Sequence, residues 1–134
     1  MIPRLKPRPW WLFWLGRDRW LTVAPTIYHP RSVNPELFPA LIAHEQTHLS
    51  QQTGHEIIWL IRYLLQPSFR LSQEVEAIAV EVSFYTPTQR AAIVNWYATA
   101  LSSAAYLWAA FSRSTALNAI TTAVIAKETA RDQA

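Results

Sequence analysis

The amino-acid sequence predicts a small, mainly α-helical domain with at most one or two short edge strands. The chain has only two glycines in 134 residues, too few for the many turns of a β-sandwich or barrel. Alanine and leucine are abundant, and both favour helices. Nine prolines punctuate the candidate helices. A chain of this length buries one core, so a single structural unit is expected.

Residues 1–19 are predicted to form a basic, aromatic arm. Asp18 is the one acid in this segment, against five basic residues: Arg4, Lys6, Arg8, Arg17 and Arg19. The apolar run WWLFWL is short for a signal peptide, and no small-residue cleavage site follows it, so no signal peptide is expected. No motif that reads nucleic acid accompanies the basic residues, and we expect no nucleic-acid partner.

Residues 20–28 form the one segment that predicts a strand. The run WLTVAPTIY is β-branched and aromatic, and Pro25 lacks a backbone donor, so the run is expected to form an edge strand or an extended segment. Asn34 followed by Pro35 then marks a helix start, and this helix is expected over 35–52, ending near Gly54.

Four further helices are expected after Gly54. Proline and capping residues set their boundaries, and Thr86-Pro87-Thr88-Gln89 is a capping box at the start of the third of them. The expected ranges are 56–65, 73–84, 87–111 and 115–131, with Ser72 capping the second of these helices and Ser114 the last. Together, residues 20–85 are expected to form the functional core and 86–134 a C-terminal helical pair that packs on it or lies in an interface.

Residues 91–112 carry no charge and are long enough, as a helix, to cross a hydrocarbon core of about 30 Å. Their many alanines and their polar residues make them less apolar than an ordinary membrane span. Small residues at positions 98, 102, 105 and 109 would also let another helix approach closely. A buried or oligomer-forming helix is therefore favoured, with a membrane span as the alternative.

The run HEQTH at 44–48 carries the chemistry of the sequence. Residues four apart lie on one face of a helix, so His44 and His48 can bind one metal ion. Glu45 lies one step round the helix, where it can act as the base for a water at the metal.

A third ligand must come from further along the chain, because tetrahedral zinc with an open position needs three protein ligands and no cysteine is present. His55 and Glu56 follow the helix end too closely to reach the same ion. Glu74 and Glu76 lie on the helix expected over 73–84, and only one of them can face the metal. Periodicity alone leaves that choice open.

The segments HEQTHLSQQ and LSQEVEAIA resemble the gluzincin metallopeptidases, in which a helix carrying HExxH precedes a second helix with a glutamate ligand. They are also similar to small phage- and bacterium-associated HExxH proteins with a second motif near E-x-E-A. In related families with an ExxAD motif the first glutamate is the ligand, which implies Glu74, with Glu76 as the alternative. Ile78 stands where that motif has aspartate, and Glu81 can supply the missing contact to a histidine.

The motif and the resemblance together imply a zinc-dependent peptidase that binds one zinc ion and acts on a peptide or protein. Glu45 would be the general base, and an oxyanion donor is expected among Tyr63, Tyr85 and Arg62. Substrate could lie extended along the 20–28 edge.

The alternative is a structural or assembly protein, a phage virion component or a membrane-associated subunit, in which the metal site is vestigial or structural. The excess of tryptophan and the long uncharged segment favour this alternative, with a homo-oligomer or larger assembly formed through the Trp-rich arm and the C-terminal helices. The cytoplasm or a phage particle is favoured over secretion.

Overall fold

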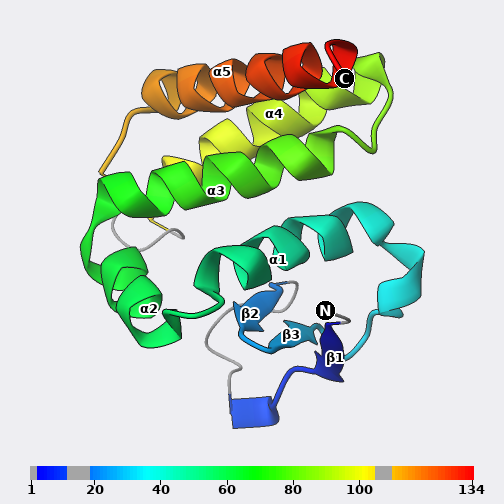
Figure 1. Ribbon diagram of the computed structural model, residues 1–134, viewed down its shortest axis with the longest axis vertical. Helices are drawn as coiled ribbons and strands as arrows, with labels where there is room; N and C mark the ends of the chain where they lie inside the picture. Colours follow the sequence, from blue (N-terminus) through cyan, green and yellow to red (C-terminus); the bar gives the residue numbers. More distant parts are fainter. Residues whose placement is uncertain (1–2, 12–18, 105–109) are drawn as a thin grey trace.

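The computed structural model describes residues 3–11, 19–104 and 110–134, and its elements follow one another in layers along the long axis (Figure 1). A small sheet lies at one end, α1 covers it, α3 runs alongside α1 in the next layer, and α4 and α5 form the other end (Figure 1). The predicted mainly α fold with C-terminal helices is confirmed.

The sheet has three strands in the described residues rather than the one or two expected: β1 (Arg4–Pro7), β2 (Leu21–Val23) and β3 (Thr26–His29). Their order is β1-β3-β2, with β1 parallel and β2 antiparallel to β3. The segment 20–28 was expected to be a single edge strand or extended segment, but a turn at Ala24 and Pro25 folds it into a hairpin of β2 and β3. The strand β1 was not predicted, since RLKP lacks the alternation of apolar and polar residues that marks a strand.

The helix expected over 35–52 is divided in two. A short 3-10 helix, η2, covers Pro35–Leu37, and α1 runs over Pro39–Gln52. Phe38 separates them with φ −126° and ψ 61°, because a residue before proline disfavours the helical region. Asn34 caps η2 as predicted, its side chain accepting a hydrogen bond from the Glu36 amide.

The other helices are present, with some boundaries moved. They are α2 (Glu56–Leu65), α3 (Pro67–Val82), α4 (Pro87–Leu101) and α5 (Arg113–Asp132).

Three predicted boundaries are wrong. The helix α3 begins at Pro67, which suits a first helical position, and Ser72, the expected cap, lies inside it. The helix α4 ends at Leu101 instead of reaching 111, where the hydroxyls of Ser102 and Ser103 donate to carbonyls of the last turn. The cap of α5 is Ser112 rather than Ser114. Small-residue positions 105 and 109 lie outside the described residues.

The apolar core lies between α3, α4 and α5. Its fully buried members include Ile78 and Val82 on α3, Ala98 on α4, and Ala116 and Ile120 on α5. The opposite side of α3 faces α1 (Figure 1). The helix α3 therefore contributes to the core with one face and to the α1 contact with the other.

The helices of the described ranges do not combine the length and apolarity that a membrane span needs.

A pair of isoleucines on α5 tests the assignment of the core. We expect Ile120→Ala to lower the free energy of unfolding by about 2–5 kcal/mol, because it empties a fully buried position. Ile125 is exposed on the same helix, so Ile125→Ala is the matched control and should change stability by less than about 0.5 kcal/mol. Urea unfolding followed by circular dichroism measures both, and equal effects would contradict the packing described.

Candidate metal centre

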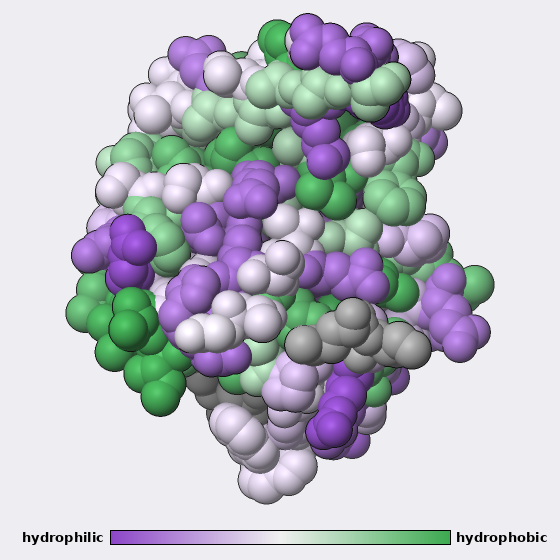
Figure 2. Space-filling model, in the orientation of Figure 1, coloured by the Kyte–Doolittle hydropathy of each residue, from purple (hydrophilic) through white to green (hydrophobic). Residues whose placement is uncertain are grey.

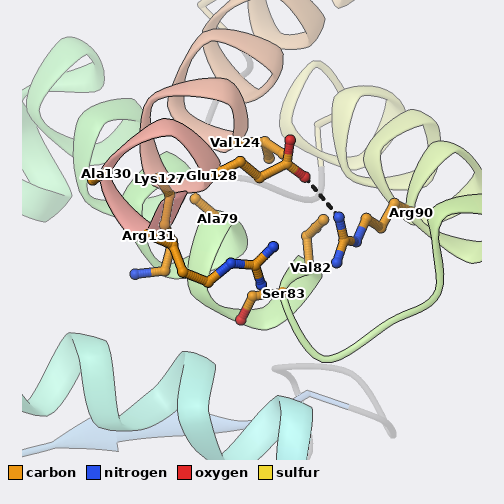
Figure 3. A pocket seen from close by; sticks show the side chains of 9 residues that line it. All are labelled: Ala79, Val82, Ser83, Arg90, Val124, Lys127, Glu128, Ala130 and Arg131. Atoms are coloured by element: carbon orange, nitrogen blue, oxygen red, sulfur yellow. Dashed lines mark hydrogen bonds and ion pairs between the residues drawn. The ribbon is translucent and has the colours of Figure 1, made fainter. Parts of the chain in front are cut away.

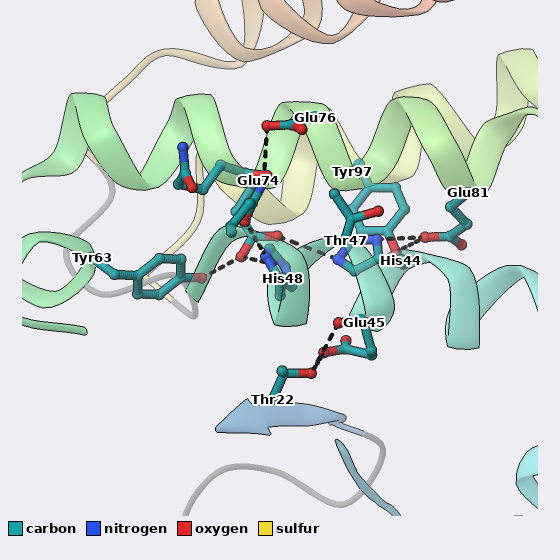
Figure 4. A network of polar contacts seen from close by, with 12 residues as sticks. Thr22, His44, Glu45, Thr47, His48, Tyr63, Glu74, Glu76, Glu81 and Tyr97 are labelled. Carbon is teal, nitrogen blue, oxygen red and sulfur yellow. Dashed lines mark hydrogen bonds and ion pairs between the residues drawn. The ribbon is translucent and has the colours of Figure 1, made fainter. Parts of the chain in front are cut away.

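His44 and His48 lie four residues apart on the face of α1 that meets α3, and Glu74 of α3 lies opposite them (Figure 4). The Nε2 atom of His44 is 3.6 Å from Glu74 Oε2, and Nε2 of His48 is 3.5 Å from Glu74 Oε1. Ligand atoms of the three residues all lie within 4.8 Å of one another, and all three side chains are buried. This histidine–glutamate group could hold a metal ion.

The other ring nitrogen of each histidine is held by an acceptor. His44 Nδ1 donates to Glu81 Oε2 at 2.9 Å, and His48 Nδ1 donates to Gln51 Oε1 at 2.9 Å. The Gln51 amide is oriented by its own nitrogen, which donates to the Gln73 carbonyl. Because both Nδ1 atoms carry the proton in the neutral rings, both Nε2 atoms present a lone pair to the same point, as metal ligands do.

The two carboxylate oxygens of Glu74 differ in their hydrogen bonding. Its Oε1 accepts from the Tyr63 hydroxyl, whereas its buried Oε2 has no hydrogen-bond partner in the described part of the chain. A buried carboxylate oxygen without a partner is costly unless a cation or proton compensates it. A metal ion bound to the two Nε2 atoms would supply that partner, so the residues present fit a cation.

Burial and neighbouring charges shift the pKa values of this histidine–glutamate group in opposite directions. Burial alone would lower the pKa of His44, but the carboxylates of Glu74 and Glu81 outweigh it and raise the pKa to about 10. Burial also disfavours the charged form of His48, yet Glu74 raises its pKa as well. Burial would raise the pKa of Glu74, and the two histidines hold it well below its usual range. Without metal, His44 is therefore protonated near neutral pH and faces the Glu74 carboxylate.

No family model matches the chain, and neither the curated proteins nor the solved structures contain a match to it. The chemistry of the centre therefore rests on its own residues.

The structure separates the two candidate glutamates on α3. Glu74 is buried beside the histidines, whereas Glu76 is exposed and accepts a hydrogen bond from Gln51 Nε2 at 3.1 Å. Glu81, the candidate for the missing aspartate, contacts His44 from further along α3.

The three candidate oxyanion donors lie at different places. The Tyr63 hydroxyl reaches Glu74 and so lies at the centre (Figure 4). The Tyr85 hydroxyl donates to Glu81 Oε1 at 3.4 Å, so it contacts the residue that orients His44 and not a metal-ligand candidate. Arg62 contacts Gln66 and lies over the Phe69 ring instead.

Glu45 is buried on α1 and its side chain is directed toward the sheet (Figure 4). Its Oε2 accepts a hydrogen bond from the Thr22 hydroxyl of β2 at 2.6 Å. Gln52, also on α1, fixes β2 in turn, accepting from the Ala24 amide at 2.8 Å and donating to the Thr22 carbonyl at 2.9 Å. These contacts occupy backbone groups of the 20–28 segment at which an extended substrate was expected to bind.

Sequence reasoning missed four residues that hold the site: Thr22, Gln51, Gln52 and Tyr97. Gln51 could have been found from its spacing, since it lies three residues after His48 on the same helical face. Tyr97 stacks on the His44 ring and donates to Glu81 Oε2 at 2.5 Å, but it lies on α4, and only the tertiary fold brings it there.

A cavity of about 360 Å³ lies elsewhere, between α3, α4 and α5 (Figure 3). Cationic side chains from α4 and α5 lie at it, with Arg90 paired to Glu128 at 2.7 Å. None of the residues of the metal centre lines this cavity, so it is separate from the candidate metal chemistry.

Exchange of each α3 glutamate tests which of them binds metal. Loss of a residue that only contacts a metal ligand weakens metal binding roughly 10–100-fold. Glu74→Gln removes a charged ligand itself, so it should weaken zinc binding by more than that. Glu76→Gln, the matched control, should change affinity only a few-fold. Competition with a chromophoric chelator measures both, and similar losses in the two variants would contradict the assignment.

Proton release should accompany metal uptake. The pKa of His44 in the folded, metal-free protein is about 10, above the ordinary 6.5, so His44 is protonated near neutral pH. Metal binds the neutral ring, so the proton must leave, and the apparent affinity should rise by about tenfold per pH unit for each proton released until pH approaches the pKa. Zinc titration calorimetry in buffers of different ionisation enthalpy measures the release. Heats that do not depend on the buffer would contradict it.

Proposed function

We propose that this protein is a zinc-dependent peptidase, with His44, His48 and Glu74 as zinc ligands and Glu45 as general base. The observation that carries the proposal is the convergence of two Nε2 atoms on the Glu74 carboxylate, one oxygen of which makes no hydrogen bond in the described part of the chain, beside Glu45 on the same helix as the histidines. The resemblance of HEQTH and the α3 glutamate to gluzincins supports the same interpretation.

The donor set supports zinc over harder ions. Two imidazole nitrogens and one carboxylate, with no thiolate, are the ligands of catalytic zinc sites, which keep a further position for water or substrate. Magnesium and calcium prefer sites built from oxygen alone. When bound, zinc would supply a Lewis acid that polarises a carbonyl and acidifies a water molecule.

The roles of the protein groups follow from their contacts. Thr22 holds Oε2 of Glu45, which leaves the other carboxylate oxygen to take a proton from the attacking water and pass it to the leaving amine. Glu81 and Gln51 orient the two histidines. Tyr63 is the candidate donor for the developing oxyanion, because its hydroxyl is the one of the three that reaches a ligand.

The burial of the centre favours a second function, in which the metal only fastens the fold. His44, His48 and Glu74 are each less than 7% exposed, as in closed structural sites, and the metal would join α1 to α3. Such a metal makes no use of the Glu45 carboxylate, so Glu45 distinguishes the two functions.

The variant Glu45→Gln tests the proposal. We expect the zinc-loaded wild type to hydrolyse fluorescein-labelled casein, and Glu45→Gln to lose about 10²–10⁴-fold of that rate, because the base is gone. Its zinc content and melting temperature should stay near those of the wild type.

Glu36→Gln, at an exposed position on η2, is the matched control and should keep full activity. Equal rates in Glu45→Gln and wild type would contradict the role of the base. Bound zinc with no hydrolysis of casein or of a mixed peptide library would favour the structural function.

A further inference from the structure

The outward face of α2 is an exposed aliphatic stripe. Six of the ten residues of this helix are exposed isoleucines or leucines: Ile57, Ile58, Leu60, Ile61, Leu64 and Leu65. Their spacing places them side by side on one continuous face. Figure 2 shows a hydrophobic patch at the lower left, at the place that α2 occupies in Figure 1.

The stripe is not needed for the fold, because the other face of α2 makes the internal contacts. Trp59 is buried and donates to Gln73 Oε1 at 2.8 Å, and Tyr63 stacks on Trp59 and contacts Glu74. Monomeric proteins seldom expose a contiguous apolar face of this kind unless it binds something.

Basic and aromatic side chains lie at the same end of the molecule. The sheet and the segment that follows β1 are at the end of the long axis opposite α4 and α5, as is α2 (Figure 1). Arg4 and Lys6 are exposed on β1, and Trp10 and Trp11 just after it are 75% and 57% exposed. Exposed aliphatic, tryptophan and basic residues together are the composition of surfaces that rest on anionic lipid.

We propose that this end of the protein docks on the surface of an anionic bilayer, with α2 lying in the plane of the interface. The aliphatic stripe enters the boundary of headgroups and acyl chains, the tryptophans lie at headgroup level, and Arg4 and Lys6 meet lipid phosphates. A helix of ten residues is about 15 Å long, which suits a helix on the membrane and is too short for one across it.

A second copy of the chain is a weaker occupant of the same face. A stable dimer buries about 800 Å² on each partner, and one helix face roughly 15 Å by 10 Å is small against that. The cores of protein interfaces are also enriched in aromatic residues and arginine, whereas the stripe is purely aliphatic. Basic residues on β1 would repel their own copies but attract anionic lipid.

Vesicle co-sedimentation of the full chain tests the proposal. We expect binding to vesicles of phosphatidylcholine mixed with phosphatidylglycerol to exceed binding to pure phosphatidylcholine by roughly tenfold or more, and to weaken with added salt. The triple variant Ile57→Gln, Ile58→Gln and Leu65→Gln removes three of the most exposed side chains of the stripe and should bind roughly a hundredfold less. Glutamine adds no charge, so this loss isolates the apolar contribution.

Two further variants serve as comparisons. Ile125→Gln, exposed on α5 at the other end, is the matched control and should bind like the wild type. Arg4→Gln with Lys6→Gln should lose the preference for anionic lipid. Zinc content and circular dichroism show that each variant is folded, and neither depends on peptidase activity.

Equal binding of the triple variant and the wild type would overturn the proposal, as would absence of binding to the anionic vesicles. Sedimentation velocity without lipid provides the remaining outcome. A wild-type dimer that the triple variant dissociates would show that a second copy occupies the stripe, and would overturn the lipid assignment.

Discussion

The structure depends on the contact between two buried carboxylates of α3 and the histidines of α1. Glu74 and Glu81 are each less than 4% exposed, and so are too deep to be solvated by bulk water. Buried carboxylates are tolerated only where charge or hydrogen bonds compensate them. His44, His48, Tyr63 and Tyr97 supply that compensation from three other helices, so the polar centre fixes how α1, α2 and α4 meet α3.

The two faces of α3 explain the departure at Ile78 from the motif that the sequence resembles. Ile78 is fully buried in the apolar cluster shared with α4 and α5, where an aspartate would lack a partner. Glu81 lies three residues further along α3, on the side nearer α1, and its longer side chain reaches His44 Nδ1. Glu81 thus makes the contact to the histidine that the motif assigns to its aspartate, and the side chain at position 78 packs in the apolar core.

Local signals predicted the helices well and the sheet poorly. The capping box at Thr86 and the proline after the end of α2 act on adjacent residues, so these boundaries could be predicted. The strand β1 exists because its backbone pairs with β3, about twenty residues away along the chain. The sequence RLKP itself contains no signal for that pairing. The division of the 35–52 helix at Phe38 follows from Pro39, which disfavours the helical region for the residue before it. One continuous helix was expected because the first turn of a helix that starts at Pro35 tolerates a second proline.

In the candidate site, too, local sequence signals predicted some residues, and tertiary packing places the others. His44, Glu45 and His48 are close in sequence, and their spacing alone places the two histidines on one helical face. The choice between Glu74 and Glu76 depends on the rotation of α3, which its apolar neighbours Val75, Ile78 and Val82 fix only when α4 and α5 are in place. Thr22 and Tyr97 are brought to the site by tertiary packing, and no local pattern marks them.

The helix α2 links the metal centre to the exterior of the molecule. Tyr63 on its inner face donates to Glu74, and Trp59 beside it packs edge-on against His48 with ring centroids 6.0 Å apart. The aliphatic stripe occupies the opposite face of the same ten residues. The two faces share one helical backbone, so a movement of α2 as a rigid body would also move Tyr63. Because Tyr63 holds one oxygen of Glu74, a shift of α2 changes the hydrogen bonding of a metal-ligand candidate directly. The exposed face and one contact of the buried centre are therefore carried by the same ten-residue helix.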